Sequence, residues 1–203
     1  ESKALMLSIS AFSDNNRVTA NLGATHLSER KGLLGSRLTG AFATGGETST
    51  TALSFGGDWQ LGRGYVLSGT YTLARSDTDP LSTNILSIHG PITSHAMAVG
   101  IKKDHIFDRN DVFHLSVSQP LRVSKGMASL SHADYLDQDQ QFHYRNASIN
   151  LAPAGREIDF QVGYTRNLSN ENRIKVLIYH ANDYNHMAGQ TDYGGLIRFE
   201  QVF

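Results

Sequence analysis

The sequence predicts an all-β chain that forms a single antiparallel, up-and-down β-barrel of about twelve strands over residues 1–203. Segments in which apolar residues alternate with polar or small ones recur along the whole chain, and this period of about two residues is typical of strands. Turn-forming clusters such as "SDNN" and "GRG" separate the segments. No window carries the apolar stripe of an amphipathic helix, so no helix of ordinary length is expected.

Each expected strand is defined by its own alternation. Leu5, Leu7 and Ile9 share one face of the first strand, and the same pattern continues along the chain. The clearest case is residues 157–166, where Ile158 and Phe160 begin a run of apolar residues on one face. The expected strands cover residues 5–11, 18–24, 36–44, 50–61, 65–74, 94–103, 111–119, 126–132, 142–151, 157–166, 173–181 and 192–203.

The connections between these strands alternate in length. Residues 76–94 and 182–192 form long loops, whereas residues 62–64, 107–110 and 168–172 form short turns. Long loops at one rim and short turns at the other are typical of outer-membrane barrels. Two of the expected short turns, "SERKGLLG" and "DYLDQDQQ", are longer than this pattern favours.

Composition excludes some classes of protein. The 18 lysines and arginines nearly balance the 19 acidic residues, giving a net charge of -1. The basic residues are scattered and form no stripe, so we expect no nucleic-acid partner. No run approaches the roughly 18 consecutive apolar residues of a membrane helix, but a barrel hides its lipid-facing residues in alternation. Cysteine is absent, which excludes a disulfide framework and a thiolate metal site and suits an exported bacterial protein.

Alternation alone does not separate a membrane barrel from a soluble β-sandwich, because both have one apolar and one polar face. Two features favour the membrane. The polar positions of residues 157–166 are suited to a water-filled lumen, and we expect Glu157, Asp159, Gln161 and Thr165 to line it. Aromatic residues near strand ends suit the girdles at a membrane interface; they are Trp59, Tyr65, Tyr164, Tyr193 and Phe203.

The last strand carries a further signal. A terminal aromatic residue with apolar residues at alternating positions before it resembles the recognition signal of the outer-membrane barrel assembly machinery. Here the matching residues are Tyr193, Ile197, Phe199 and Phe203, whereas Gln201 departs from the apolar preference. The alternative is an ordinary edge strand at the end of a soluble domain.

Longer phrases in the second half of the chain carry a family resemblance. "VSQPLRVSKGMASL", "INLAPAGREIDFQVGYTRNL" and "NHMAGQTDYGGLIRF" resemble the C-terminal region of Gram-negative subtilisin-like serine peptidases that are arranged like autotransporters. The resemblance implies a twelve-stranded translocator barrel, with the passenger peptidase upstream and outside this chain. It also implies outer-membrane lipid, the barrel assembly machinery and the passenger as partners, in the outer membrane of a Gram-negative bacterium.

The chain shows no catalytic signature of its own, so we expect no enzyme, cofactor or metal. The Asp, His and Ser elements of a subtilisin-like triad and a Gly-x-Ser-x-Gly elbow are absent, and "HGP" at His89 is expected in a loop. His180, Asp183 and His186 are expected in one loop and have the ligand chemistry of a metal site, but solvated loop residues are the simpler interpretation. Glu157 and Asp159 are more simply lumen charges than an acid-base pair.

The leading hypothesis is therefore a translocator and membrane anchor for an exported peptidase. Three alternatives remain from the sequence: a small-solute pore, a barrel-borne enzyme, and a soluble β domain that packs on the peptidase.

Overall fold

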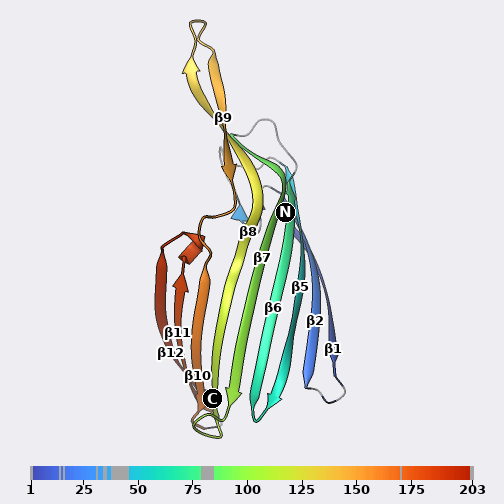
Figure 1. Ribbon diagram of the computed structural model, residues 1–203, viewed down its shortest axis with the longest axis vertical. Coiled ribbons are helices and arrows are strands. Elements are labelled where there is room, and N and C mark those ends of the chain that lie inside the picture. The colour runs from blue at the N-terminus through green and yellow to red at the C-terminus, as the bar shows by residue number, and fades with distance from the viewer. Residues whose placement is uncertain are drawn as a thin grey trace.

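The computed structural model describes residues 2–13, 15, 17–30, 32–33, 36–37, 46–78, 85–169 and 171–201. The prediction of an all-β, antiparallel, up-and-down fold is confirmed, because ten strands form one sheet (Figure 1). The only helical segment among these residues is a single 3-10 turn, η2 (Tyr184–His186). The strands of the sheet are β1 (Ser2–Phe12), β2 (Val18–Arg30), β5 (Glu47–Gly62), β6 (Tyr65–Thr78), β7 (Leu86–Asp104), β8 (Asp111–Leu136), β9 (Phe142–Asn150), β10 (Ile158–Asn167), β11 (Asn172–Asn182) and β12 (Thr191–Gln201).

The sheet is open, so the predicted closed barrel of about twelve strands is not confirmed. Its hydrogen-bonded path runs β1-β2-β5-β6-β7-β8-β10-β11-β12, and β9 pairs with β8 off this path. Strands β1 and β12 are the two edges, and within the described part of the chain neither has a partner on its outer side. Two very short strands, β3 (Gly32–Leu33) and β4 (Ser36–Arg37), pair only with each other. Most of the strand expected at 36–44 lies outside the described residues.

Strand β8 differs most from expectation. The strands expected at 111–119 and 126–132 are parts of this single strand of 26 residues. Its lower part pairs with β10 and its upper part with β9, so the β8–β9 hairpin extends beyond the rest of the sheet (Figure 1). Ladder pairing continues through the polar and basic residues between the two segments, which is why alternation did not reveal the continuity.

Residues 86–94 were expected in a long loop, and this expectation is wrong, because they belong to β7. His89 therefore lies in a strand and not in a loop. Gly90 adopts φ 71° beside register shifts at residues 89–95, so the strand bends where glycine is free to do so. The bent part buries Ile88 and Ile92 against Ala128 of β8, and this small apolar core stabilises the pairing of β7 with β8 beyond the bend.

The predicted alternation of connection lengths is confirmed in part. The connections after β1, β5, β7 and β10 are shorter than those after β2, β6 and β11, but the connections after β2 and β8, where the short turns "SERKGLLG" and "DYLDQDQQ" were expected, lie at the end with the longer connections. Short connections follow β1, β5, β7 and β10 at one end of the sheet, which we call the short-turn rim. Longer connections follow β2, β6 and β11 at the other end, the long-loop rim, where the β8–β9 hairpin also lies (Figure 1). No helix in the described residues is long and apolar enough to cross a bilayer.

Candidate functional site

The most distinctive feature of the sheet is a continuous apolar face. Residues directly opposite each other in an antiparallel ladder point to the same side. One such row runs Leu7, Ala24, Leu53 and Leu73 across four strands. On the other half of the sheet, Val117, Phe160, His180 and Tyr193 form a corresponding row. The two halves meet where Val99 of β7 pairs with Val117 of β8, so the face is continuous from edge to edge.

These apolar side chains are exposed to the surroundings. Leu7 is 65% exposed, Phe55 64% and Ile197 77%, although all three lie within strands. Among the described residues, only five apolar side chains are buried, and three of them belong to the small core under the bent part of β7. A soluble sandwich would bury this face against a second sheet. The fold therefore presents an apolar surface far larger than soluble monomers normally expose.

Polar residues lie above one part of the apolar face and below another, and we call the apolar region between these two levels the apolar belt. Toward the long-loop rim, His26, Thr51, Arg75 and Thr93 form a row across β2, β5, β6 and β7. Toward the short-turn rim, Asp111 lies opposite Arg166. Between these limits the stretch from Tyr65 to Leu73 of β6 rises about 27 Å along the strand. At the tilt of about 40° that is typical of strands in membrane barrels, this stretch would span about 21 Å, slightly less than their apolar band of about 25 Å.

Aromatic residues mark the lower limit of the belt. Tyr65 is the first residue of β6, and the ammonium Nζ of Lys103 lies 4.6 Å from the centroid of its ring. Tyr164 donates a hydrogen bond from its hydroxyl to Asp111 Oδ2 at 3.0 Å. Trp59 is 53% exposed in the last third of β5. The two tyrosine rings thus combine an apolar body with a polar neighbour, the arrangement that favours a membrane-water interface.

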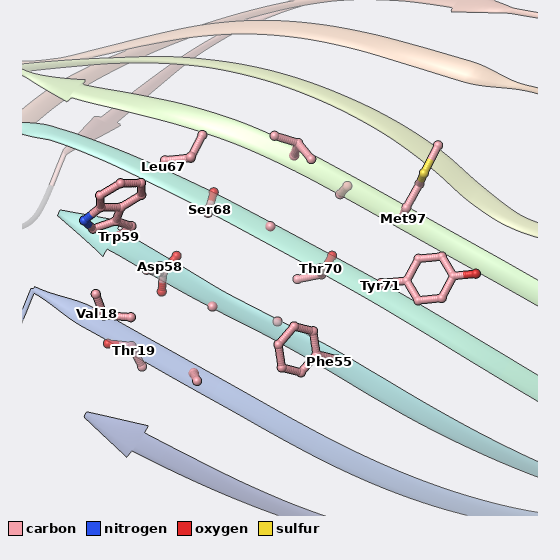
Figure 2. Close-up of a pocket in the computed structure, with 16 residues that line it drawn as sticks. Val18, Thr19, Phe55, Asp58, Trp59, Leu67, Ser68, Thr70, Tyr71 and Met97 are labelled. Carbon is pink, nitrogen blue, oxygen red and sulfur yellow. The ribbon is translucent and has the colours of Figure 1, made fainter. Parts of the chain in front are cut away.

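A hollow lies in the belt, and sequence reasoning missed it. Gly57 of β5 lies opposite Gly69 of β6, and the hollow around them has a volume of about 580 Å³. Phe55 and Trp59 flank Gly57 on the same strand, while Leu67 and Tyr71 flank Gly69 (Figure 2). The signal was present in the sequence as two glycines, each with large apolar residues two positions away on both sides, in strands joined by a three-residue turn.

The opposite face carries small and polar side chains. The hydroxyls of Ser54 and Thr72 are 2.9 Å apart across β5 and β6, and Tyr179 donates a hydrogen bond to Asp192 at 2.9 Å across β11 and β12. Near the short-turn rim, Glu200 accepts a hydrogen bond from Lys175 Nζ at 2.8 Å. Arg198 and Arg173 also approach Glu200, at 3.1 Å and 3.8 Å. Charged and hydroxyl groups therefore gather on this side, away from the belt.

Three of the four residues predicted to line a lumen lie on this polar face. Asp159 lies opposite Ser118 and Ala181, Gln161 opposite Ser116 and Tyr179, and Thr165 opposite Val112 and Lys175. The fourth residue, Glu157, precedes β10 and is buried. Because the sheet is open, a lumen in front of these residues stays a prediction.

The residues of the predicted C-terminal signal share the apolar face of β12. Tyr193 lies opposite His180, Ile197 opposite Val176, and Phe199 opposite Ile174. Tyr193 is 79% exposed. Phe203 lies outside the described residues. The structure thus places three of the four signal residues side by side on the belt, whereas their recognition by assembly machinery stays a prediction.

His180, Asp183 and His186 do not form a metal cluster. His180 lies within β11, not in the loop, and its Nε2 is 3.1 Å from Asn182 Oδ1. Asp183 accepts hydrogen bonds from the backbone N–H groups of Arg156 at 3.0 Å and Gly189 at 2.8 Å. These two N–H groups hold the pKa of Asp183 below its ordinary value. In the part of the chain that the structure describes, no group of three or more histidine, cysteine or acidic residues is placed to hold a metal ion.

His186 instead connects three segments at the long-loop rim. Its Nδ1 accepts a hydrogen bond from the backbone N–H of Glu157 at 3.0 Å, and its Nε2 donates to the carbonyl oxygen of Leu121 at 3.1 Å. Its own carbonyl accepts from the N–H of Gly155 at 2.9 Å. Arg122 of β8 binds the carbonyl oxygens of Pro153 and Gly155 at 2.8 and 3.0 Å. These groups fix the loop 183–190 against the segment before β10, and we call them the loop brace.

No protein-family model matches this chain, and no curated protein matches it significantly.

Proposed function

We propose that this chain forms part of the wall of a β-barrel in the outer membrane of a Gram-negative bacterium. In this proposal the barrel translocates an exported serine peptidase or anchors it at the membrane. The observation that carries the proposal is the apolar belt: it crosses nine strands, and its large side chains are exposed.

The energetics favour lipid over water as the neighbour of the belt. Each large apolar side chain left in water forgoes about 1.5–3 kcal/mol of burial free energy. The belt holds many such side chains, and the small core around Ile88 does not compensate for them. In a bilayer the hydrocarbon removes the same side chains from water, so no second layer of protein is needed to cover them. The backbone of the paired strands is also satisfied there, because the sheet ladders supply the partners that water would otherwise provide.

The arrangement of the rims supports the translocator role. Short turns at one end and long connections at the other are the pattern of outer-membrane barrels, in which the long connections face the outside. Strand β12 ends at the short-turn rim, with Tyr193, Ile197 and Phe199 on the lipid-facing side, as expected for a strand that the assembly machinery reads. The proposed link to a peptidase passenger rests on the phrases in the second half of the chain that resemble those of subtilisin-like autotransporters.

The proposal assigns no catalysis to this chain. The polar groups at the long-loop rim, His186 and Asp183 among them, are engaged in hydrogen bonds that hold backbone segments together. A small-solute pore is the second candidate, favoured by the serines, threonines and charges of the polar face. Steady ion conductance in planar bilayers with no passenger attached would favour the pore.

The direct test is the behaviour of the protein in membrane fractions. We expect the expressed chain to require detergent for extraction, to float with liposomes in a density gradient, and to migrate faster on a gel unheated than boiled. A monomer that stays soluble without detergent would contradict the proposal. A fusion to an upstream reporter domain then separates a translocator from a pore, because only a translocator places the reporter on the outside of the cell.

A further inference from the structure

The inference concerns the two edges of the sheet and deepens the proposed function, on which it rests. Among the residues that the structure describes, the sheet has ten strands, of which β9 lies off the main path, so nine described strands form the wall. Every neighbouring pair in the wall is antiparallel. With an odd number of strands, the first and the last run the same way. Both β1 and β12 therefore run from the long-loop rim to the short-turn rim.

Strand β1 lacks the features that normally protect an edge from pairing. Its sequence, "SKALMLSISAF", contains no proline and a single charged residue, Lys3. Leu5 is 72% exposed on the belt side and Met6 75% exposed on the other side. No register shift interrupts its pairing with β2, so the edge is regular. A long, regular, apolar edge of this kind is a template for another strand.

The proposed membrane location makes unpaired edges costly. Unsatisfied backbone N–H and C=O groups cost several kcal/mol each in hydrocarbon, so a membrane sheet has to close on itself. Direct pairing of β1 with β12 would join them in parallel. A second copy inserted with the same orientation offers the same combination, β12 of one chain beside β1 of the other, and is also parallel. Bacterial outer-membrane barrels instead close with an even number of antiparallel strands.

We propose that β1 and β12 are bridged by an odd number of additional β-strands, supplied by a polypeptide segment outside the strands that the structure describes. The strand beside each edge runs from the short-turn rim to the long-loop rim. Its apolar residues lie level with Leu5, Leu7 and Ile9 of β1 or with Ile197 and Phe199 of β12, on the belt side. Its small or polar residues lie beside Ser8 and Ser10, or beside Gly194, on the polar side.

Engineered cysteines test whether the two edges touch, because the chain has no cysteine of its own. Ile9→Cys would be combined in turn with Gly195→Cys, Ile197→Cys and Phe199→Cys, to sample different registers of a parallel pair. The control pairs are Ile9→Cys with Leu22→Cys and Val176→Cys with Ile197→Cys, whose members lie directly opposite each other. In the detergent-folded protein, a short thiol cross-linker should join the control pairs and none of the edge pairs. Efficient cross-linking of any edge pair within a monomer would overturn the proposal.

A peptide probe tests what the edges accept. The peptide "VTANLGATHLSER" has the sequence of β2, which already pairs with β1 in the antiparallel sense. A control peptide has the same composition with the alternation scrambled. Hydrogen exchange of residues 2–12 and 191–201 should be fast in the protein alone, and about tenfold slower in at least one edge with the β2 peptide. Protection of both edges without peptide, or no protection by the β2 peptide, would overturn the inference. Both results leave the proposed function standing, because it is tested by membrane insertion.

Discussion

Gly57 and Gly69 lie opposite each other on the same face of the sheet, yet the structure predicts opposite responses to alanine. A Cβ added at Gly57 would run into the backbone carbonyl oxygen of Thr19 on β2, and a ladder carbonyl has little freedom to move aside. A Cβ added at Gly69 would meet nothing nearer than the carbonyl oxygen of Ala98, at 3.9 Å, which is ordinary contact. Each substitution changes the chain by the same single methyl group, so the pair is internally matched.

The two substitutions should change the free energy of unfolding differently. Overpacking against a backbone that cannot relax costs about 1–3 kcal/mol, so Gly57→Ala should lower the free energy of unfolding by that amount. Gly69→Ala removes backbone freedom from the unfolded chain and meets no clash, so it should be neutral or stabilise by up to about 1 kcal/mol.

Urea unfolding of the two variants and the parent protein in the same lipid vesicles, followed by Trp59 fluorescence, measures these differences. The reasoning would be refuted if Gly69→Ala were as destabilising as Gly57→Ala. Equal tolerance of both substitutions would also refute it, because the close approach of β2 to Gly57 would then be wrong.

The remaining predictions concern the belt, the loop brace and the turn before β8. Val99→Arg, in the middle of the belt, should make the free energy of membrane insertion less favourable by about 2–4 kcal/mol, whereas Ala98→Arg on the polar face should change it little. Liposome flotation measures the difference, and an equal loss of flotation for both variants would contradict a sheet with one lipid-facing and one polar side. The pKa of Asp183 is lowered in the folded protein, so its stabilising effect is present above the ordinary aspartate pKa and is lost as pH falls through the folded value. Proteolysis of loop 183–190 should therefore increase in acid, and Asp183→Asn should abolish that dependence while retaining a residue that tolerates φ 51°. Asp111 accepts hydrogen bonds from the backbone N–H groups of Ile106, Phe107 and Asp108 at 2.8–3.0 Å, and so holds the turn before β8. Asp111→Ala should therefore lower the urea midpoint more than Asp139→Ala in the β8–β9 turn, and a smaller effect would contradict a stabilising role for Asp111 in its turn.

Local alternation predicted most of the wall because each strand exposes one face to a single environment. Residues 157–166 are the best example: Phe160 and Val162 face one way, Asp159 and Gln161 the other, and the ladder with β8 and β11 preserves that division. The short turn at Gly62–Gly64 was equally predictable, since both glycines adopt positive φ there.

What sequence reasoning missed depends on pairing between distant segments. Nothing local to Arg122 or Lys125 indicates that β8 continues through them, because the partners that extend it come from β7 and β9. The hollow at Gly57 could not be predicted either, because only the register between β5 and β6 shows that Gly69 lies opposite Gly57. The loop brace joins residues far apart in sequence, so His186 looked like a ligand or a solvated residue until the N–H of Glu157 was placed beside it.

The central claim is that the apolar belt faces hydrocarbon while the opposite side of the same strands faces water. Val117 and the preceding Ser116 of β8 lie in the middle of the wall on opposite faces. Each would be replaced by cysteine in turn, labelled with an environment-sensitive fluorophore and reconstituted in vesicles. The fluorophore at Val117→Cys should be quenched by lipids carrying a spin label in the acyl chain and not by aqueous iodide, with the reverse for Ser116→Cys. Iodide quenching of Val117→Cys, or its burial away from both quenchers, would contradict the account.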